Sequence, residues 1–138
     1  MTTTTAARAI VVLDTSAIVA ILKDEPEAAG FIEHAMSFKR RVIAAPTWFE
    51  TAIVCEGKKA SGGEFFDRLA VELRLEVLPF TSEQAAIARQ GYKKFGKGRG
   101  GKAQLTFGDC FAYALAKTLR APLLFKDDDF SHTDVTPA

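Results

Sequence analysis

Residues 10–22 constrain the fold of this chain more than any other stretch of the sequence. The first four, Ile10–Leu13, form an uninterrupted apolar run, which is typical of a strand buried on both faces of a parallel sheet. Asp14 and two hydroxyl residues interrupt the run, and the apolar pattern resumes at helical length over residues 17–22. The segment therefore predicts a strand, a polar turn and a helix, with a carboxylate at the sheet edge where open α/β folds bind ligands.

The rest of the chain alternates predicted helices with short apolar strands. Helices are expected over residues 27–38, 46–60, 64–75, 82–95 and 107–119, and strands over residues 41–45, 76–80 and 122–125. This alternation, with no internal repeat and no linker, predicts a three-layer α/β/α sandwich with a mainly parallel central sheet. We expect a loose tail over residues 1–9 and a single domain over residues 10–138.

Charge, cysteine content and hydropathy limit the kinds of protein to which this chain can belong. The formal net charge is +1, so the overall charge does not indicate binding to nucleic acid or to a membrane. Cys55 and Cys110 each lie in an apolar helical pattern, which fits reduced and buried thiols. We recognise neither a secretory signal nor an apolar run that could cross a bilayer, so we expect a cytoplasmic protein with no membrane partner.

Acidic side chains interrupt the apolar pattern at four places in the chain. Asp14 and the acidic cluster at residues 127–129 each follow a predicted strand, so both are expected at the same edge of a parallel sheet. Glu50 and Asp109 are each expected in the first turn of a helix, in the favourable field of its N-terminus. Thr106 precedes Asp109 by three residues and predicts a capping box.

Each acid taken alone has an ordinary structural explanation as a cap, a first-turn residue or part of a solvated turn. Four acids that meet at one edge would repel one another, and a cation between them is the simplest remedy. No histidine or cysteine is placed to join them. Ligation by oxygen alone favours Mg²⁺ or Mn²⁺.

A basic, glycine-rich loop leads into the Asp109 helix. Between residues 89 and 102 the chain carries six positive side chains and no acid: Arg89, Lys93, Lys94, Lys97, Arg99 and Lys102. Such a run is often only a solvated loop, but beside an acidic metal site it suits a phosphate backbone. Acids, a divalent metal and a basic loop together are the arrangement that phosphodiester hydrolysis needs.

Four segments resemble the PIN-domain ribonucleases, and specifically the VapC toxins of bacterial type II toxin–antitoxin pairs. They are VVLDTSAIVAIL, APTWFETAIV, LTFGDCFAYALAK and PLLFKDDDFSHTDV, and together they span nearly the whole chain. The resemblance implies a PIN-domain fold and a Mg²⁺- or Mn²⁺-dependent endoribonuclease that cleaves RNA. It also implies a cognate VapB-type antitoxin and a homodimer.

The resemblance also assigns roles to residues of this sequence. Asp14, Glu50 and Asp109 carry over as metal-coordinating, catalytic acids. The fourth acid is open among Asp127, Asp128 and Asp129, with Asp127 expected as the fourth metal ligand and both Asp127 and Asp129 as catalytic. Residues expected to assist the ligands or to contact substrate are Thr15, Ser16, Lys97, Arg99 and Lys102.

Two other functions are compatible with parts of the sequence. A strand-end aspartate before a small polar turn also occurs in phosphatases of the haloacid-dehalogenase type, but these carry a second aspartate two residues later, where this chain has Ser16. A catalytically silent PIN fold that only binds RNA or a partner protein is the remaining alternative.

Overall fold

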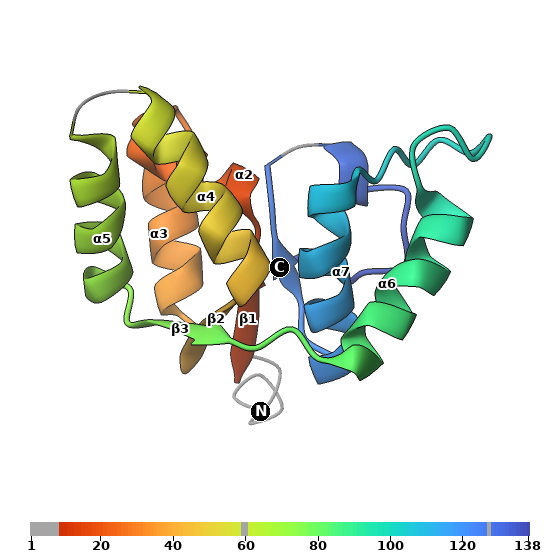
Figure 1. The fold of residues 1–138 in the computed structure, drawn as a ribbon. Helices are drawn as coiled ribbons and strands as arrows, with labels where there is room; N and C mark the ends of the chain where they lie inside the picture. Colours follow the sequence, from red (N-terminus) through yellow and green to blue (C-terminus); the bar gives the residue numbers. More distant parts are fainter. Residues whose placement is uncertain (1–8, 59–60, 127) are drawn as a thin grey trace.

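A computed structural model describes residues 9–58, 61–126 and 128–138 and shows a fully parallel four-stranded sheet (Figure 1). The strands are β1 (Ile10–Leu13), β2 (Arg40–Ala44), β3 (Leu75–Leu78) and β4 (Leu123–Leu124), and their order in the sheet is β3-β2-β1-β4. All three pairings are parallel, which confirms the predicted sheet. The observed bounds of β1 match the predicted ones, and the other three predicted strands differ from the observed ones by one or two residues at each end.

The register of the sheet brings distant segments to one edge. Val12 in β1 lies opposite Val42 in β2 and opposite Leu123 in β4. The three strands therefore end side by side. In Figure 1, β1 runs upward into α2. Asp14, the start of the helix after β2, and the segment after β4 all follow these strand ends.

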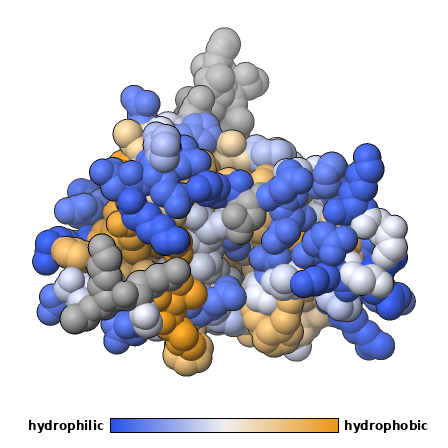
Figure 2. Space-filling view, turned by 90° about the horizontal axis from the view of Figure 1, so that it is seen from above, coloured by the Kyte–Doolittle hydropathy of each residue, from blue (hydrophilic) through white to orange (hydrophobic). Residues whose placement is uncertain are grey.

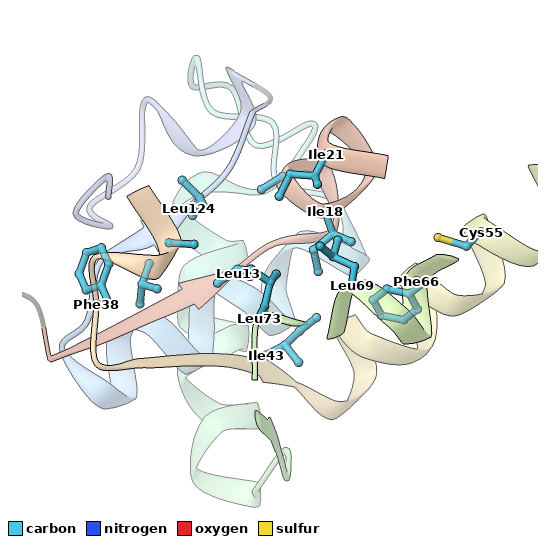
Figure 3. Close-up of a cluster of buried hydrophobic side chains, with 13 residues drawn as sticks. Leu13, Ile18, Ile21, Phe38, Ile43, Cys55, Phe66, Leu69, Leu73 and Leu124 are labelled. Atoms are coloured by element: carbon cyan, nitrogen blue, oxygen red, sulfur yellow. The ribbon is translucent and has the colours of Figure 1, made fainter. Parts of the chain in front are cut away.

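Four helices cover one face of the sheet: α2 (Thr15–Leu22), α3 (Ala28–Met36), α4 (Ala45–Lys58) and α5 (Gly62–Glu72). Val11 and Leu13 of β1 belong to the buried core on this side of the sheet. Figure 3 shows Leu13 in this core together with Ile18 of α2 and Phe66 of α5. Because alternate residues of a strand point to opposite faces, Val12, between Val11 and Leu13, belongs to the other core.

The opposite face carries α6 (Ser82–Phe95) and α7 (Phe107–Leu119). Most of α7 is buried from Cys110 to Ala116, as its apolar sequence predicts. Phe130, in the short 3₁₀ helix η1 (Asp128–Phe130) near the end of the chain, is buried in this same core. The predicted three-layer α/β/α architecture is therefore confirmed.

One predicted position is wrong. Glu50 does not lie in the first turn of its helix, because α4 begins at Ala45 directly after β2, with no connecting residue. Glu50 is the sixth residue of α4 and lies in the second turn. Cys55 and Cys110 are buried free thiols, as the sequence predicts. In the described part of the chain, no helix has the length and apolarity needed to cross a membrane.

Candidate active site

Asp14 lies at the end of β1 and starts α2. Its backbone N–H donates to the carbonyl of Leu124 in β4 over 3.0 Å, and its Oδ2 accepts from the backbone N–H of Ser16 over 3.0 Å. Asp14 is therefore the N-cap of α2 as well as the strand-end acid. Only 4% of the residue is exposed, so the sheet and the helix together fix its carboxylate.

Thr15 connects the start of α2 to Glu50. Its Oγ1 donates to Glu50 Oε1 over 3.3 Å and lies 2.8 Å from Thr51 Oγ1. Thr51 is itself buried and donates to the carbonyl of Thr47 within α4. The second turn of α4 is thereby attached to the residue beside Asp14, which brings Glu50 to the same edge of the sheet.

Asp109 is held at the start of α7 by the predicted capping box. Its backbone N–H donates to Thr106 Oγ1 over 3.3 Å, and its Oδ2 accepts from the backbone N–H of Thr106 over 3.0 Å. The preceding residue, Gly108, brings the backbone of α7 close to Glu50: a Cβ placed on Gly108 would lie 2.4 Å from Glu50 Oε2. A residue without a side chain is needed for this approach.

The three acids line one cleft of about 290 Å³ at the carboxyl edge of the sheet. Thus the structure brings together Asp14, Glu50 and Asp109 from three separate parts of the sequence. The remaining lining residues are Thr15, Ser16, Val19, Ala20, Lys23, Glu25 and Lys126. Figure 2 looks down on this edge, which hydrophilic residues largely cover, with hydrophobic patches toward the lower rim of the view.

Burial and mutual repulsion make this cleft unfavourable for bare carboxylates. Burial raises the pKa of Asp14 to about 7; hydrogen bonds from Ser16 oppose the rise, and the charges of Asp109 and Glu50 add to it. Burial likewise raises the pKa of Asp109 to about 6, and the charge of Asp129 adds to that rise. The site therefore favours either protons or a cation.

The two described acids of the tail differ in their surroundings. Asp129 is half-buried, and its charge acts on Asp109. The Asp128 side chain is 86% exposed, and its Oδ2 lies 3.8 Å from His132 Nε2. Asp127, the expected fourth metal ligand, lies outside the described residues.

The basic loop lies apart from the acidic cleft. Lys97 lines a second groove of about 610 Å³ between α6 and the start of α7, together with Arg89, Tyr92 and Phe107. Arg99 and Lys102 are exposed on the loop, and neither lines the acidic cleft. The structure thus separates the cationic loop from the acids, which the sequence alone could not show.

The donor set of the cleft fits a hard divalent cation, because Asp14, Glu50 and Asp109 offer only oxygen atoms. The side chains are not drawn into a tight cluster: within residues 9–58, 61–126 and 128–138, no three acidic, histidine or cysteine side chains stand close enough together to hold one ion as they lie. Glu50 and Asp109 are instead engaged with Thr15 and Thr106.

Sequence reasoning missed several residues of the site, among them Glu25, Gly108 and Lys126. Lys126 follows a predicted strand, so the parallel topology could have placed it beside Asp14. Glu25 lies in the turn after α2, and its position depends on how that turn folds back. The contact of Gly108 with Glu50 depends on the packing of α4 against α7, for which the sequence carries no local signal.

Comparison with known proteins identifies the family. The PIN domain family model matches residues 11–135. Ribonuclease VapC28 of Mycobacterium tuberculosis is 41% identical over 128 residues, which cover 92% of this chain and 96% of that protein.

Two solved structures share the fold. One is VapBC2 from Rickettsia felis bound to a DNA fragment from the promoter, with a TM-score of 0.71, 17% identity, and coverage of 93% of this chain and 96% of that one. The other is M. tuberculosis VapC20, described as a sarcin–ricin loop cleaving toxin, with a TM-score of 0.71, 15% identity, and coverage of 93% and 98%. The chain therefore belongs to the PIN-domain family and, within it, to the VapC ribonucleases.

Proposed function

We propose that the acidic cleft is the active site of a divalent-metal-dependent endoribonuclease, the toxin of a type II toxin–antitoxin pair. One observation carries the assignment of the site: Asp14, Glu50 and Asp109 line a single cleft in a chain of the VapC family. These acids come from the end of β1, the second turn of α4 and the first turn of α7. Three carboxylates that repel one another in one cleft destabilise the fold, so a purely structural role does not explain them.

Mg²⁺ or Mn²⁺ is the proposed cofactor. Asp14 and Asp109 would hold the ion, with Glu50 as a further ligand. When bound, such an ion offsets negative charge on a phosphodiester and makes water a better nucleophile at neutral pH. The raised pKa values of Asp14 and Asp109 support the proposal, because a nearby cation would relieve the desolvation and repulsion that cause them.

The chain's own residues orient this site. Ser16 holds one oxygen of Asp14, and Thr15 holds one oxygen of Glu50, so both carboxylates keep fixed directions. Among the described tail acids, Asp129 is the better candidate for the fourth acid, since its charge acts on Asp109 while Asp128 faces solvent and His132. Asp127 remains a candidate.

RNA is the proposed substrate. The family supports it, and the basic loop supplies exposed cations at Lys97, Arg99 and Lys102 that could contact the strand beyond the cleft. VapC20, one of the proteins that share the fold, is described as cleaving the sarcin–ricin loop.

A VapB-type antitoxin and a second copy of the chain are the proposed protein partners. The fold is shared with a VapBC2 structure, which supports an antitoxin partner. Large apolar side chains exposed on neighbouring helices support a protein interface: Phe49 and Ile53 of α4 are 61% and 55% exposed, and Phe107 of α7 is 80% exposed.

Asp14→Asn and Asp109→Asn test the proposal. Each substitution removes a charge that the metal needs and keeps a side chain that can cap its helix. We expect cleavage of an end-labelled single-stranded RNA in Mg²⁺ or Mn²⁺ to fall by at least about a hundredfold in each variant. EDTA should abolish cleavage by the wild-type protein.

Asp67→Asn is the matched control, because Asp67 is exposed on α5, away from the cleft. It should cleave RNA like the wild type. Full cleavage by Asp14→Asn, in a preparation free of contaminating nuclease, would contradict the proposed site. RNA binding without metal-dependent turnover in the wild type would favour a catalytically silent PIN fold instead.

A further inference from the structure

Lys126 is fixed beside the acidic cleft by its backbone. Its N–H donates to Ser16 Oγ over 3.0 Å, and the backbone N–H of Ser16 donates to Asp14 Oδ2 over 3.0 Å. Two hydrogen bonds therefore connect the main chain at Lys126 with the carboxylate of Asp14. The contacts of Ser16 that hold the carboxylate of Asp14 therefore also fix the backbone of Lys126, from which the lysine side chain extends.

Among the described residues, the carboxylates of Glu25 and Glu27 hold the ammonium group of Lys126 at the wall of the cleft. Its Nζ donates to Glu25 Oε1 and lies 3.7 Å from Glu27 Oε2. Glu25 lies in the turn that follows α2, so the ion pair links that turn to the segment after β4. Both Lys126 and Glu25 line the same hollow as Asp14, Glu50 and Asp109.

The charge of the cleft is unfavourable for the proposed substrate. Of the residues that the structure describes, four acids line it, and Lys23 and Lys126 are the cationic residues in that lining. A phosphodiester brought to the acids carries a negative charge of its own, so cationic side chains beside the acids favour its binding with or without a metal. The six basic residues at positions 89–102 do not meet this need, since none of them lines the cleft.

We propose that Lys126 binds a backbone phosphate of the RNA at the acidic cleft, and that Glu25 and Glu27 hold its ammonium group there until the phosphate replaces them. This inference rests on the proposed ribonuclease function and adds a substrate-binding residue to it. The exchange needs only rotation of a flexible four-carbon side chain, whose ammonium group acts as a point charge toward phosphate oxygens. The exposed ion pair contributes little to folding, so its loss leaves the fold intact.

The salt dependence of RNA binding tests this role. A fluorescein-labelled single-stranded RNA of mixed sequence is titrated with protein in EDTA, and the dissociation constant is measured by anisotropy between about 50 and 200 mM KCl. Each phosphate that a cation neutralises on single-stranded RNA adds about 0.7 to the slope of log affinity against log salt. We expect Lys126→Gln to weaken binding several-fold at low salt and to reduce the slope by about 0.7.

Lys117→Gln is the matched control. Lys117 is also an ion-paired lysine, with a side chain 35% exposed against 38% for Lys126, but it pairs with Asp134 and lies in the last turn of α7, the end opposite Asp109. Its removal should leave both the affinity and the slope unchanged. Lys126→Arg should keep the wild-type slope because it keeps the charge.

Glu25→Gln separates substrate binding from a structural role. If Glu25 competes with phosphate for Lys126, this substitution should tighten RNA binding, and the gain should disappear in the Glu25→Gln, Lys126→Gln double variant. A purely structural ion pair would instead give weaker binding, or no change, in both single variants together with a lower melting temperature.

Three outcomes would overturn the proposal: a Lys126→Gln slope equal to that of the wild type, an equal loss in Lys117→Gln, or no RNA binding by the wild type. The ribonuclease assignment is judged separately, by cleavage in the Asp14→Asn variant. An unchanged slope with cleavage lost in Asp14→Asn would reject Lys126 as a phosphate ligand and leave the active site in place.

Discussion

At the scale of single residues, the site depends on side chains that each have two roles. Asp14 caps α2 and faces the cleft, and Asp109 completes a capping box and faces the same cleft. Both could be predicted because a strand-end acid and a capping pair are local patterns. The role of Gly108 could not be predicted. A side chain at this position would collide with the carboxylate of Glu50, which lies fifty-eight residues away in the sequence.

Gly108→Ala tests this close approach. The added Cβ would lie 2.4 Å from Glu50 Oε2, the end of a flexible side chain, so Glu50 must leave its position while the helix stays formed. We expect RNA cleavage to fall at least several-fold, while the free energy of unfolding, measured in urea, stays within about 1 kcal/mol of the wild type.

Gly91→Ala gives the contrasting result. Its Cβ would lie 2.3 Å from the ring of Tyr113, which is buried and donates to Asp134. Because a packed ring cannot yield, we expect stability to fall by about 1–3 kcal/mol, with normal cleavage by the folded fraction. Normal cleavage by Gly108→Ala would show that Glu50 does not need its observed position.

At the scale of helices and strands, the sequence predicted what local rules control. The capping box at Thr106 is confirmed, because Thr106 accepts a hydrogen bond from the backbone N–H of Asp109, and Asp109 accepts one from the backbone N–H of Thr106. The turn that holds Glu50 was wrongly predicted, because α4 begins at Ala45, one residue before the predicted start, and Glu50 is its sixth residue. Boundaries set by tertiary packing have no local signal.

Thr106→Ala tests how the start of α7 is held. The substitution removes the oxygen that accepts from the Asp109 N–H and leaves the bond from the Thr106 N–H to Asp109. We expect a loss of about 1 kcal/mol in the free energy of unfolding, measured by urea denaturation. Thr106→Ser keeps the hydroxyl and should retain most of that stability, and equal losses in the two variants would assign the effect to the methyl group.

At the scale of the whole molecule, parallel topology explains why the acids meet. Strands that run in one direction end at one edge, so Asp14 and the tail acids could be predicted to lie together. The same reasoning does not fix which tail acid faces Asp109, nor that the basic loop opens onto a separate groove. Those features depend on how η1 and the residue 96–105 loop fold back on the sheet.

The shared cleft also predicts how stability changes with pH. The pKa of Asp14 is raised from 3.8 to about 7, so the fold favours its neutral form. In the absence of metal, this contribution to stability is fully present below about pH 4 and is lost as the pH rises through 7. Asp109, with a pKa raised to about 6, changes stability in the same direction.

Thermal unfolding with and without Mn²⁺, for the wild type and Asp14→Asn at pH 5 and pH 7.5, tests the central claim most directly. Without metal, the neutral side chain of Asp14→Asn should make this variant more stable than the wild type at pH 7.5, with a smaller difference at pH 5. Millimolar Mn²⁺ should raise the melting temperature of the wild type at pH 7.5 and have little effect on Asp14→Asn. An equal rise in both proteins, or none in either, would contradict a cation site built around Asp14.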